Sequence, residues 1–380
     1  MNIAIDSLFL YSSPFTGISI YTKELIRQFA LFDNLDVSVI YAGKSDSERE
    51  QIKKELVNCE YKLLEIPISG KLARSTWSFS DFPNITPYLK EIDIYHSPFY
   101  ILPGLSNSQK VIVTIYDIFP ILFPKFFPLT TRVAHLQRLN KIKRYCENDN
   151  VGIVTVSNHS KKDIVEKMGI PEEKIAVTHL GVQSIFNANP ISDSKEILNK
   201  YNISYPFILS VGSINPRKNI ERLLEAFTLM KKNNKLPHKL VLVGTSGWLN
   251  GKIKASIQGN KDIILIGIVP EDELPTFFQQ ADLFMFPSLY EGFGLPVIEA
   301  MACGAPVITS NCSSLPEIAG DAAVLVDPYN SKKISEAMLH ILTNSAAKHD
   351  MIQKGIEQSK KFNWEKTAKM TLEAYKMLQI

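Results

Sequence analysis

The sequence is poor in the patterns that form disulfides or hold metal ions. Its four cysteines, Cys59, Cys146, Cys303 and Cys312, form no C-x-x-C pair and no compact set with histidine at zinc spacing. The chain also has no D-x-D pair of the kind that holds a divalent cation against donor phosphates. We therefore expect no metal and no other cofactor, and the unpaired thiols favour a reducing, cytoplasmic location.

Long apolar runs are missing as well. No stretch approaches the roughly 20 apolar residues that span a bilayer, and the opening MNIAIDSLFLYSS reaches Asp6 at once, which is typical of a first β-strand rather than a signal peptide. Of the 380 residues, 45% are hydrophobic and 21% are charged, as in ordinary folded proteins. The formal net charge of +3 is too small to indicate nucleic-acid binding.

Acidic residues are absent between Asp117 and Glu147. This interval is rich in basic residues and contains the apolar, aromatic run IFPILFPKFFP. Such a segment is able to rest on an anionic membrane surface, which would make the protein peripheral to the membrane. It equally fits a helix that faces the core on one side and exposes a solvated basic face on the other. The basic residues are Lys125, Arg132, Arg138, Lys141, Lys143 and Arg144.

The chain is longer than one hydrophobic core usually serves, and its pattern indicates two α/β domains. Short, nearly continuous apolar runs alternate with helical patterns, which predicts parallel sheets covered by helices on both faces. The pattern weakens at about 187–206, where we place the domain boundary. We expect domains at 1–190 and 200–360, and a C-terminal helix at 364–380. The expected strands lie in NIAIDSLF, VSVIYAG, IDIYHSPF, KVIVTIYDI, VGIVTVS, FILSVGS, KLVLVGTSG, IILIGIV, DLFMFPS, APVITSN and AAVLVDP.

One short sequence resembles part of a phosphate-binding loop. Gly43, Lys44 and Ser45 follow an apolar run, but Ser38 stands where the first glycine of that motif is required. The sequence therefore gives little support to a kinase or another NTPase.

The strongest signal is SLYEGFGLPVIEAMACGAPVIT, in which Glu291 and Glu299 are separated by seven residues. If a helix begins near Gly294, the backbone N–H groups of residues 292–295 line its N-terminus and attract an anion. Two turns later, Glu299 could accept hydrogen bonds from ribose hydroxyls, as a carboxylate does in dinucleotide-binding folds. The alternative is that Glu291 caps a helix and Glu299 lies on a solvated face.

This E-x7-E element resembles the hallmark of the retaining GT-B glycosyltransferases of family 4, also called glycosyl transferases group 1. Other segments resemble that family in the same order: GISIYTKEL, VIVTIYDIFPILFP, VSNHSKKDI, LSVGSINPRKNIERLLEAF and SSLPEIAGDAAVLVDP. The resemblance implies two Rossmann-like domains that face a cleft, with the C-terminal helix crossing back to the N-terminal domain. It also implies metal-independent, retaining transfer of a hexose from a nucleotide-sugar. Within the family the chain looks most like bacterial mannosyltransferases of O-antigen, capsule or exopolysaccharide synthesis, with GDP-mannose as the first expected donor and a lipid-linked or glycan acceptor.

The resemblance also assigns roles to single residues. Arg217 and Lys218 would hold the donor pyrophosphate, and Glu291 would contact hydroxyls of the donor sugar. Without that resemblance, Arg217 and Lys218 read as surface bases at a helix start. The donor-binding set that the resemblance implies is Gly17, Gly212, Ser213, Ser288, Gly292, Phe293, Gly294, Leu295 and Glu299.

Three further residues are candidates on the N-terminal side: His96, Tyr116 and Asp117. His96 ends an expected strand, where α/β proteins place their ligands, although a lone histidine is often structural. Many relatives have His-Asp where this chain has Tyr116 and Asp117, and a tyrosine does not titrate near neutral pH. The acid–base role that the resemblance gives to the histidine of relatives is therefore open for Tyr116.

Two other functions also stay open. One is a sugar-nucleotide epimerase of the same fold, and the other is a nucleotide-sugar-binding protein with weakened catalysis.

Overall fold

The computed structural model describes residues 1–12, 16–43, 46–245, 247 and 251–378. The chain divides into two compact units: Met1–Gly181 with Trp364–Ile380, and Val182–Asn363. Lys44 and Ser45 of the possible phosphate-binding loop lie outside the described residues. The boundary between the units lies before the polar stretch 187–206, where the sequence placed it. This stretch belongs to the second unit, because its residues Ile197 and Ile203 pack in the core of that unit.

The first unit is built on a seven-stranded parallel sheet in the order β3-β2-β1-β4-β5-β6-β7. Apart from two added strands, β3 and β7, these strands were expected from the sequence. The helices and strands of this unit are β1 (Asn2–Asp6), α1 (Leu8–Ser12), α2 (Gly17–Phe29), β2 (Asp36–Ala42), α3 (Asp46–Glu55), β3 (Lys62–Ile66), α4 (Gly70–Trp77), η1 (Thr86–Tyr88), β4 (Ile94–Ser97), β5 (Lys110–Thr114), α5 (Phe119–Leu122), η2 (Pro124–Phe126), α6 (Leu129–Tyr145), β6 (Val151–Thr155), α7 (Asn158–Met168), η3 (Glu172–Lys174), β7 (Ile175–Val177) and α16 (Trp364–Lys376).

The second unit has a six-stranded parallel sheet in the order β10-β9-β8-β11-β12-β13. All six strands fall in the runs expected from the sequence. The elements of this unit are α8 (Ser194–Lys200), β8 (Phe207–Val211), η4 (Pro216–Lys218), α9 (Ile220–Asn233), β9 (Lys239–Val243), α10 (Gly251–Gln258), β10 (Ile263–Gly267), α11 (Leu274–Gln280), β11 (Leu283–Phe286), α12 (Leu295–Ala302), β12 (Val307–Ser310), α13 (Leu315–Ala319), β13 (Val324–Val326), α14 (Ser331–Thr343) and α15 (Ser345–Ser359).

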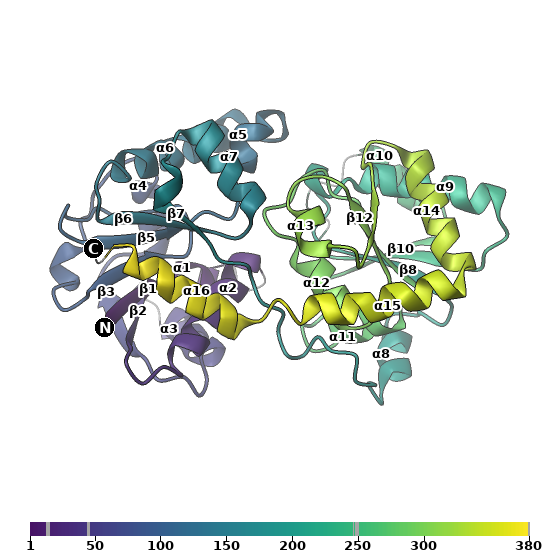
Figure 1. The fold of residues 1–380 in the computed structure, drawn as a ribbon, viewed down its shortest axis with the longest axis horizontal. Coiled ribbons are helices and arrows are strands. Elements are labelled where there is room, and N and C mark those ends of the chain that lie inside the picture. The colour runs from purple at the N-terminus through teal and green to yellow at the C-terminus, as the bar shows by residue number, and fades with distance from the viewer. Residues whose placement is uncertain (13–15, 44–45, 246, 248–250, 379–380) are drawn as a thin grey trace. The chain divides into compact units, whose positions relative to one another are not determined.

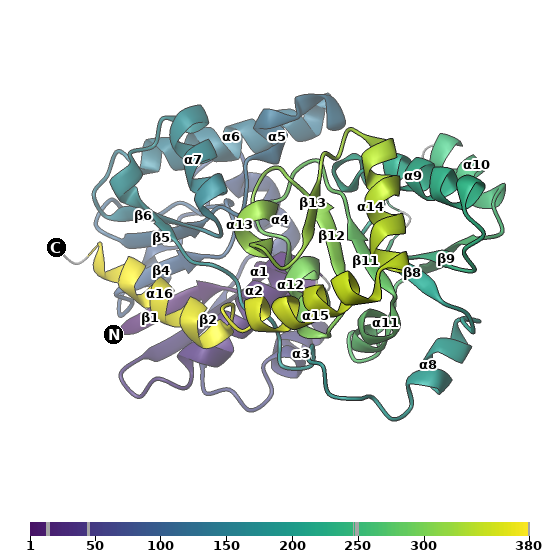
Figure 2. The same cartoon turned by 45° about the vertical axis from the view of Figure 1, so that its right-hand side comes forward.

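The second sheet is buried on both faces, which explains its apolar strands. Alternate residues of β8 enter two different cores: Phe207 and Leu209 pack with α11 and α12, whereas Ile208 packs with α9 and α14. Figure 2 shows α11 and α12 on one side of these strands and α9 and α14 on the other. Because every strand must be apolar on both sides, the sequence reads as short continuous hydrophobic runs.

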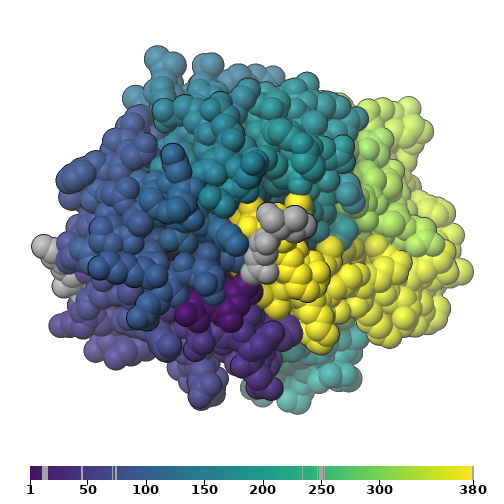
Figure 3. Space-filling view, turned by 60° about the vertical axis from the view of Figure 1, so that its left-hand side comes forward, coloured from purple at the N-terminus to yellow at the C-terminus, as the bar shows by residue number. Residues whose placement is uncertain are grey.

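The C-terminal helix α16 belongs to the first unit and packs against α2, β6 and β7 (Figure 1). In the space-filling view its yellow surface lies beside the purple and blue segments of that unit (Figure 3). Its inner side includes Ala368 and Tyr375, both fully buried. The expected return of this helix to the N-terminal domain is confirmed. No helix within the described ranges is both long and apolar enough to cross a membrane.

Each sheet reverses its strand order once, and this fixes where ligands are expected. The reversal lies between β1 and β4 in the first unit and between β8 and β11 in the second. In open α/β sheets the crevice outside the carboxyl ends of the two strands at this point is the usual binding site. In the second unit, the segments that follow β8 and β11 contain Lys218 and Glu291.

Candidate functional site

The loop after β8 is shaped by a glycine and by a side-chain cap. Gly212 has φ 138°, a conformation that favours glycine, and a Cβ there would lie 3.2 Å from Cε of Lys218. Asn215 caps the short helix η4, because its Oδ1 accepts a hydrogen bond from the N–H of Lys218 at 3.2 Å, while its Nδ2 donates to Oγ of Ser213 at 3.0 Å. The loop therefore presents Arg217 and Lys218 at the carboxyl edge of the sheet.

Asn219 and a backbone hydrogen bond tie this loop to the segment after β11. Asn219 has φ 57°, and its buried Nδ2 donates to the carbonyls of Pro287 and Pro328 at 3.0 and 2.7 Å. The N–H of Leu289 donates to the carbonyl of Arg217 at 2.8 Å. Nothing in the sequence pattern pointed to this role for Asn219. It follows from the left-handed backbone, which asparagine tolerates better than most residues.

Glu291, in the segment after β11, contacts both basic residues of the loop after β8. Its Oε1 lies 2.8 Å from Nζ of Lys218, and its Oε2 lies 3.9 Å from a terminal nitrogen of Arg217. The Glu291 side chain is 7% exposed and that of Lys218 is 12% exposed. Nζ of Lys218 also lies 4.2 Å from the ring centre of Phe286, which the sequence did not single out. A nearly buried carboxylate and two cations thus share one small polar site.

The electrostatics of this cluster keep Glu291 ionised. Burial raises the pKa of Glu291, but the charges of Lys218 and Arg217 and the hydrogen bond from Lys218 outweigh it and hold this pKa below its usual value. Burial has the larger effect on Lys218, so its pKa is lowered despite the attraction of Glu291. Removal of Lys218 or of Glu291 would leave the other side chain as a buried charge without its ion-pair partner.

The helix predicted after the first glutamate is present, and it begins where expected. Gly294 is the N-cap of α12, with φ 115°, and a Cβ there would lie 2.9 Å from a methyl carbon of Leu315. The preceding turn is held by Ser314, whose Oγ lies within hydrogen-bond distance of the carbonyls of Glu291 (2.9 Å) and Phe293 (2.7 Å). Gly292 and Phe293 are buried in this turn, and Leu295 is the first residue of the helix.

Glu299 lies inside the site rather than on a solvated helix face. It is buried on the second turn of α12. Burial and the nearby carboxylate of Glu271 raise the pKa of Glu299 from 4.5 to about 8, while Lys218 opposes this rise. The sequence did not point to Glu271, which follows β10. No cation of the described residues lies within ion-pair distance of Glu299, and a buried carboxyl group of this kind is suited to accept hydrogen bonds from a neutral hydroxylated ligand.

His96 lies in the interior of the first unit. It is fully buried, its Nδ1 lies 2.6 Å from the hydroxyl of Tyr375, and its Nε2 lies 2.8 Å from Oγ1 of Thr114. Burial lowers its pKa to about 3. Nδ1 of His96 thus connects β4 to α16, and Nε2 connects it to β5, so both ring nitrogens have partners within the first unit. Helix α16 is distant in sequence, which is why the strand pattern alone did not reveal this.

The other candidates of the first unit lie at its carboxyl edge. The hydroxyl of Tyr116 is buried and has no hydrogen-bond partner among the described residues, and its ring lies 5.6 Å from that of Tyr21. Burial raises the pKa of Tyr116 well above its usual value. Asp117 accepts a hydrogen bond from the N–H of Phe119 at 2.9 Å and so helps to start α5. Gly17 is the exposed first residue of α2, and the residues 13–15 before it are outside the described part of the chain.

Asp6 was not a sequence candidate, although it ends β1 at the reversal point of the first sheet. Its two carboxylate oxygens accept hydrogen bonds from the N–H of Leu8 (2.8 Å) and the hydroxyl of Tyr95 (3.0 Å). Burial raises the pKa of Asp6 to about 6, against these hydrogen bonds. The signal that could have found it is its position, because a polar residue at the carboxyl end of a buried strand lies at the ligand edge of the sheet.

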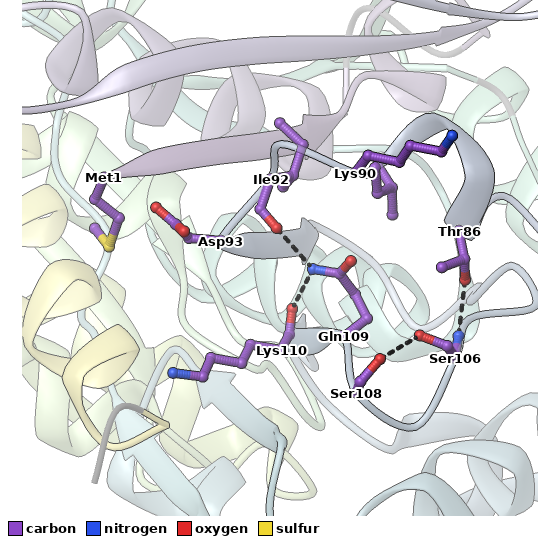
Figure 4. A pocket seen from close by; sticks show the side chains of 10 residues that line it. Met1, Thr86, Lys90, Ile92, Asp93, Ser106, Ser108, Gln109 and Lys110 are labelled. Atoms are coloured by element: carbon purple, nitrogen blue, oxygen red, sulfur yellow. Dashed lines mark hydrogen bonds between the residues drawn. The ribbon is translucent and has the colours of Figure 1, made fainter.

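A hollow of about 620 Å³ lies at the other edge of the first sheet. Met1, Asp93 and Lys110 line it at or just before the starts of β1, β4 and β5 (Figure 4). The amide of Gln109 donates to the carbonyls of Ile92 (3.3 Å) and Lys110 (3.4 Å), which holds the wall of the hollow together. None of the predicted site residues lines it, and α/β sheets bind their ligands at the opposite edge.

The fold defined by these two sheets is shared with GT-B proteins of known structure. Sucrose-phosphate synthase from Thermosynechococcus elongatus aligns with a TM-score of 0.74 and 20% identity, covering 100% of this chain and 99% of that one. WaaG, a glycosyltransferase involved in lipopolysaccharide biosynthesis, aligns with a TM-score of 0.70 and 16% identity, covering 98% of each chain. These likenesses establish the class of fold, two Rossmann-like units of the GT-B type.

Sequence comparison establishes the family. The model of glycosyl transferases group 1 matches residues 193–358, and that of glycosyltransferase family 4 matches residues 15–184. The O-antigen chain mannosyltransferase B of Escherichia coli is 30% identical over 383 residues, which cover 96% of this chain and 97% of that protein. The chain belongs to the glycosyltransferases of family 4, as its E-x7-E element indicated.

Proposed function

We propose that this glycosyltransferase moves mannose from GDP-mannose to a lipid-linked or polysaccharide acceptor, with retention of configuration, in the synthesis of a bacterial surface glycan such as O-antigen, capsule or exopolysaccharide. The observation that carries this proposal is the cluster of Lys218, Arg217 and Glu291 at the reversal point of the second sheet. The choice of mannose is supported by the E. coli O-antigen relative. The choice of guanine as the base of the donor rests on the family resemblance.

The chemistry that the cluster must assist is departure of a nucleoside diphosphate. As the bond between the anomeric carbon and the phosphate oxygen breaks, negative charge develops on that oxygen. Lys218 and Arg217 are placed to hold the pyrophosphate, and the N-terminus of α12 adds backbone N–H donors. With no donor bound, Glu291 neutralises these cations. When the phosphates take over part of that pairing, Glu291 becomes available to hydroxyls of the sugar.

Proton transfer in this proposal needs no histidine at position 116. The acceptor hydroxyl attacks the anomeric carbon on the face that the diphosphate leaves, and its proton passes to the departing phosphate oxygen. Tyr116 stays protonated because its pKa is raised well above the usual value. It therefore serves as a hydrogen-bond donor to a sugar hydroxyl or a phosphate oxygen, and not as a base.

We also propose that the reaction is independent of metal and takes place in the cytoplasm. Arg217 and Lys218 supply the positive charge that a divalent cation supplies elsewhere. Cys59, Cys146, Cys303 and Cys312 are all free thiols, which suits a reducing compartment. Turnover in excess EDTA that equals turnover with added Mg²⁺ or Mn²⁺ would support the first point, and metal-dependent turnover would contradict it.

Product analysis with Glu291→Ala tests the proposed reaction. Purified protein is incubated with GDP-mannose, with and without an oligomannose or lipid-linked acceptor, and the products are identified by mass spectrometry and NMR. We expect an α-linked mannosyl product with the wild type and turnover about 10- to 100-fold lower with Glu291→Ala. Glu357→Ala, a change at a 71% exposed side chain of the same unit, should match the wild type.

Three outcomes would contradict the proposal. Conversion of the sugar-nucleotide without an acceptor would identify an epimerase. Tight donor binding without transfer to any acceptor would identify a binding protein. Unchanged turnover of Glu291→Ala would remove Glu291 from the site.

Proton release on nucleotide binding tests the role of Glu299. The pKa of Glu299 in the empty site is about 8, so at pH 7 the carboxyl group is protonated. Ribose hydroxyls that donate to it favour the carboxylate, so binding should lower its pKa and release up to one proton. Affinity for GDP should then weaken as the pH falls below about 8, by at most about tenfold per pH unit. Calorimetric titration at pH 7 in two buffers of different ionisation enthalpy measures this release, and Glu299→Gln should bind without it. Equal release by the two proteins would rule out this role.

A further inference from the structure

Asn219 joins three segments of the second unit that follow three different strands. It comes directly after η4 in the loop that follows β8, and its Nδ2 donates to the carbonyl of Pro287 after β11 at 3.0 Å and to that of Pro328 after β13 at 2.7 Å. The residue is 4% exposed. Lys218 immediately precedes Asn219, and Glu291 lies in the segment that begins with Pro287. These hydrogen bonds therefore connect the two backbone segments that carry the ion pair of the site.

Arg222 fixes the orientation of the Asn219 amide. One terminal nitrogen of its guanidinium donates to Oδ1 of Asn219 at 3.0 Å. A guanidinium only donates hydrogen bonds and a backbone carbonyl only accepts them, so the amide fits in one way, with its oxygen toward Arg222 and its nitrogen toward the two carbonyls. Because the oxygen and both amide hydrogens are engaged, this buried side chain is held in one position.

Tyr329 supports Arg222 from the loop after β13. Cζ of Arg222 lies 5.0 Å from the centre of the Tyr329 ring, which is a cation–π contact. The backbone N–H of Tyr329 donates to Oδ1 of Asp327 at 2.9 Å, and this fixes the turn that also presents the carbonyl of Pro328. The tyrosine is 58% exposed, so its ring is available to the guanidinium and is not needed to fill the core.

A second asparagine shows that the backbone conformation alone does not explain the amide contacts. Asn202 has φ 56°, close to the 57° of Asn219, but it is exposed, and its side chain makes no hydrogen bond to any residue that the structure describes. Glycine adopts such a left-handed conformation at least as well as asparagine. The side-chain hydrogen bonds of Asn219 are therefore not required for the turn itself, and what they add is the connection between the loops.

We propose that Asn219 is a positioning residue of the donor site, and that Arg222 and Tyr329 keep its amide in place. Asn219 acts through Lys218: it sets the position of the ammonium relative to Glu291, and its own buried, fully engaged amide does not touch the donor. The consequence for turnover rests on the proposed function, in which Lys218 stabilises the leaving group. In such a site a misplacement of about 1 Å is enough to lower turnover about 100-fold.

A double-mutant cycle with Lys218→Ala tests this route of action. Asn219→Gly keeps the left-handed backbone and removes the side-chain hydrogen bonds. We expect it to weaken the affinity for GDP about 5- to 10-fold in calorimetric titration and to lower kcat with GDP-mannose about tenfold. In the Lys218→Ala background the same change should alter each quantity less than about threefold, because the ammonium to be positioned is gone. Equal, additive effects in the two backgrounds would leave Asn219 a structural role only and overturn the proposal.

Variants of the two supporting residues and a matched asparagine make the result specific. Arg222→Ala removes a hydrogen bond and the ring contact and should lower the affinity for GDP about fivefold, and Tyr329→Ala about twofold. Tyr329→Phe keeps the ring and should restore the wild-type affinity. Asn202→Gly makes the same exchange at the same backbone conformation in the same unit and should change neither affinity nor kcat. A loss in Asn202→Gly equal to that in Asn219→Gly would contradict the assignment.

Hydrogen exchange without any ligand separates this inference from the proposed function. In Asn219→Gly the backbone amides of residues 212–219 and 287–291 should exchange about tenfold faster than in the wild type, while the rest of the second unit keeps its rates. Leu289 is the most direct reporter, since its N–H donates to the carbonyl of Arg217. Unchanged exchange in these two segments would overturn the role of Asn219. A wild type without mannosyl transfer would contradict the proposed function instead, and the exchange result would then still decide on Asn219.

Discussion

Replacement of Lys218 by alanine should lower kcat about 10²- to 10³-fold, the usual effect of losing one charged donor to a leaving group. The ammonium lies 2.8 Å from Glu291 and is held over Phe286, so it has a defined position before the donor arrives. Its loss removes positive charge where the diphosphate departs. Among the described residues it also leaves the more distant Arg217, at 3.9 Å, as the cationic partner of Glu291. Steady-state transfer kinetics at saturating donor measure the effect.

Lys232→Ala is the control for this prediction. Lys232 is an exposed residue of α9 in the same unit, and its removal should leave kcat unchanged. Thermal unfolding of each protein fixes a working temperature at which all are folded. A Lys218→Ala protein with a kcat within threefold of the wild type would show that Lys218 does not stabilise the leaving group.

Replacement of Gly244 by alanine should lower the free energy of unfolding by about 3 kcal/mol, from an unfavourable backbone conformation and overpacking together. Gly244 follows β9 with φ 143°, and a Cβ there would lie 2.2 Å from the carbonyl oxygen of Gly212. The carbonyl carbon of Gly212, at 2.5 Å, and the backbone nitrogen of Ser213, at 3.1 Å, are the next nearest atoms. Because all three atoms belong to the backbone, no side-chain rotation relieves the clash. The loop that carries Lys218 must shift, so nucleotide binding should weaken as well.

Urea unfolding of Gly244→Ala and Gly251→Ala measures this difference. Gly251 begins α10, and no atom of the described residues lies within 4 Å of a Cβ built there. Alanine at this position should change the free energy of unfolding by less than about 1 kcal/mol and is able to stabilise the helix. If both variants unfold at the same urea concentration as the wild type, the close approach of the two glycine loops has no energetic consequence.

Most strands could be predicted from the sequence because both sheets are buried on both faces. The six strands of the second unit all read as continuous apolar runs. The two missed strands are exceptions for physical reasons. β3 is an edge strand with the burial pattern of a half-exposed segment, and β7 has only three residues. Their pairing with β2 and β6 comes from tertiary contacts that a local pattern does not contain.

The candidate site was predictable where it depends on local sequence and unpredictable where distant segments meet. Glycines between Glu291 and Glu299 indicated the start of α12, and the helix begins there. The pairing of Glu291 with Lys218 joins residues 73 positions apart, so spacing alone does not give it. His96 shows the same limit, because its partner Tyr375 returns from the far end of the chain.

Calorimetric titration of nucleoside diphosphates tests the central claim, that the reversal point of the second sheet holds the nucleotide part of the donor. GDP, UDP, dTDP and ADP are titrated into the wild type and into Lys218→Ala. We expect saturable binding of one of them, GDP first, and an affinity at least about tenfold lower for Lys218→Ala, since the lost contact is an ionic hydrogen bond. Absence of binding by all four nucleotides, or equal affinity of the two proteins for the nucleotide that binds, would contradict it.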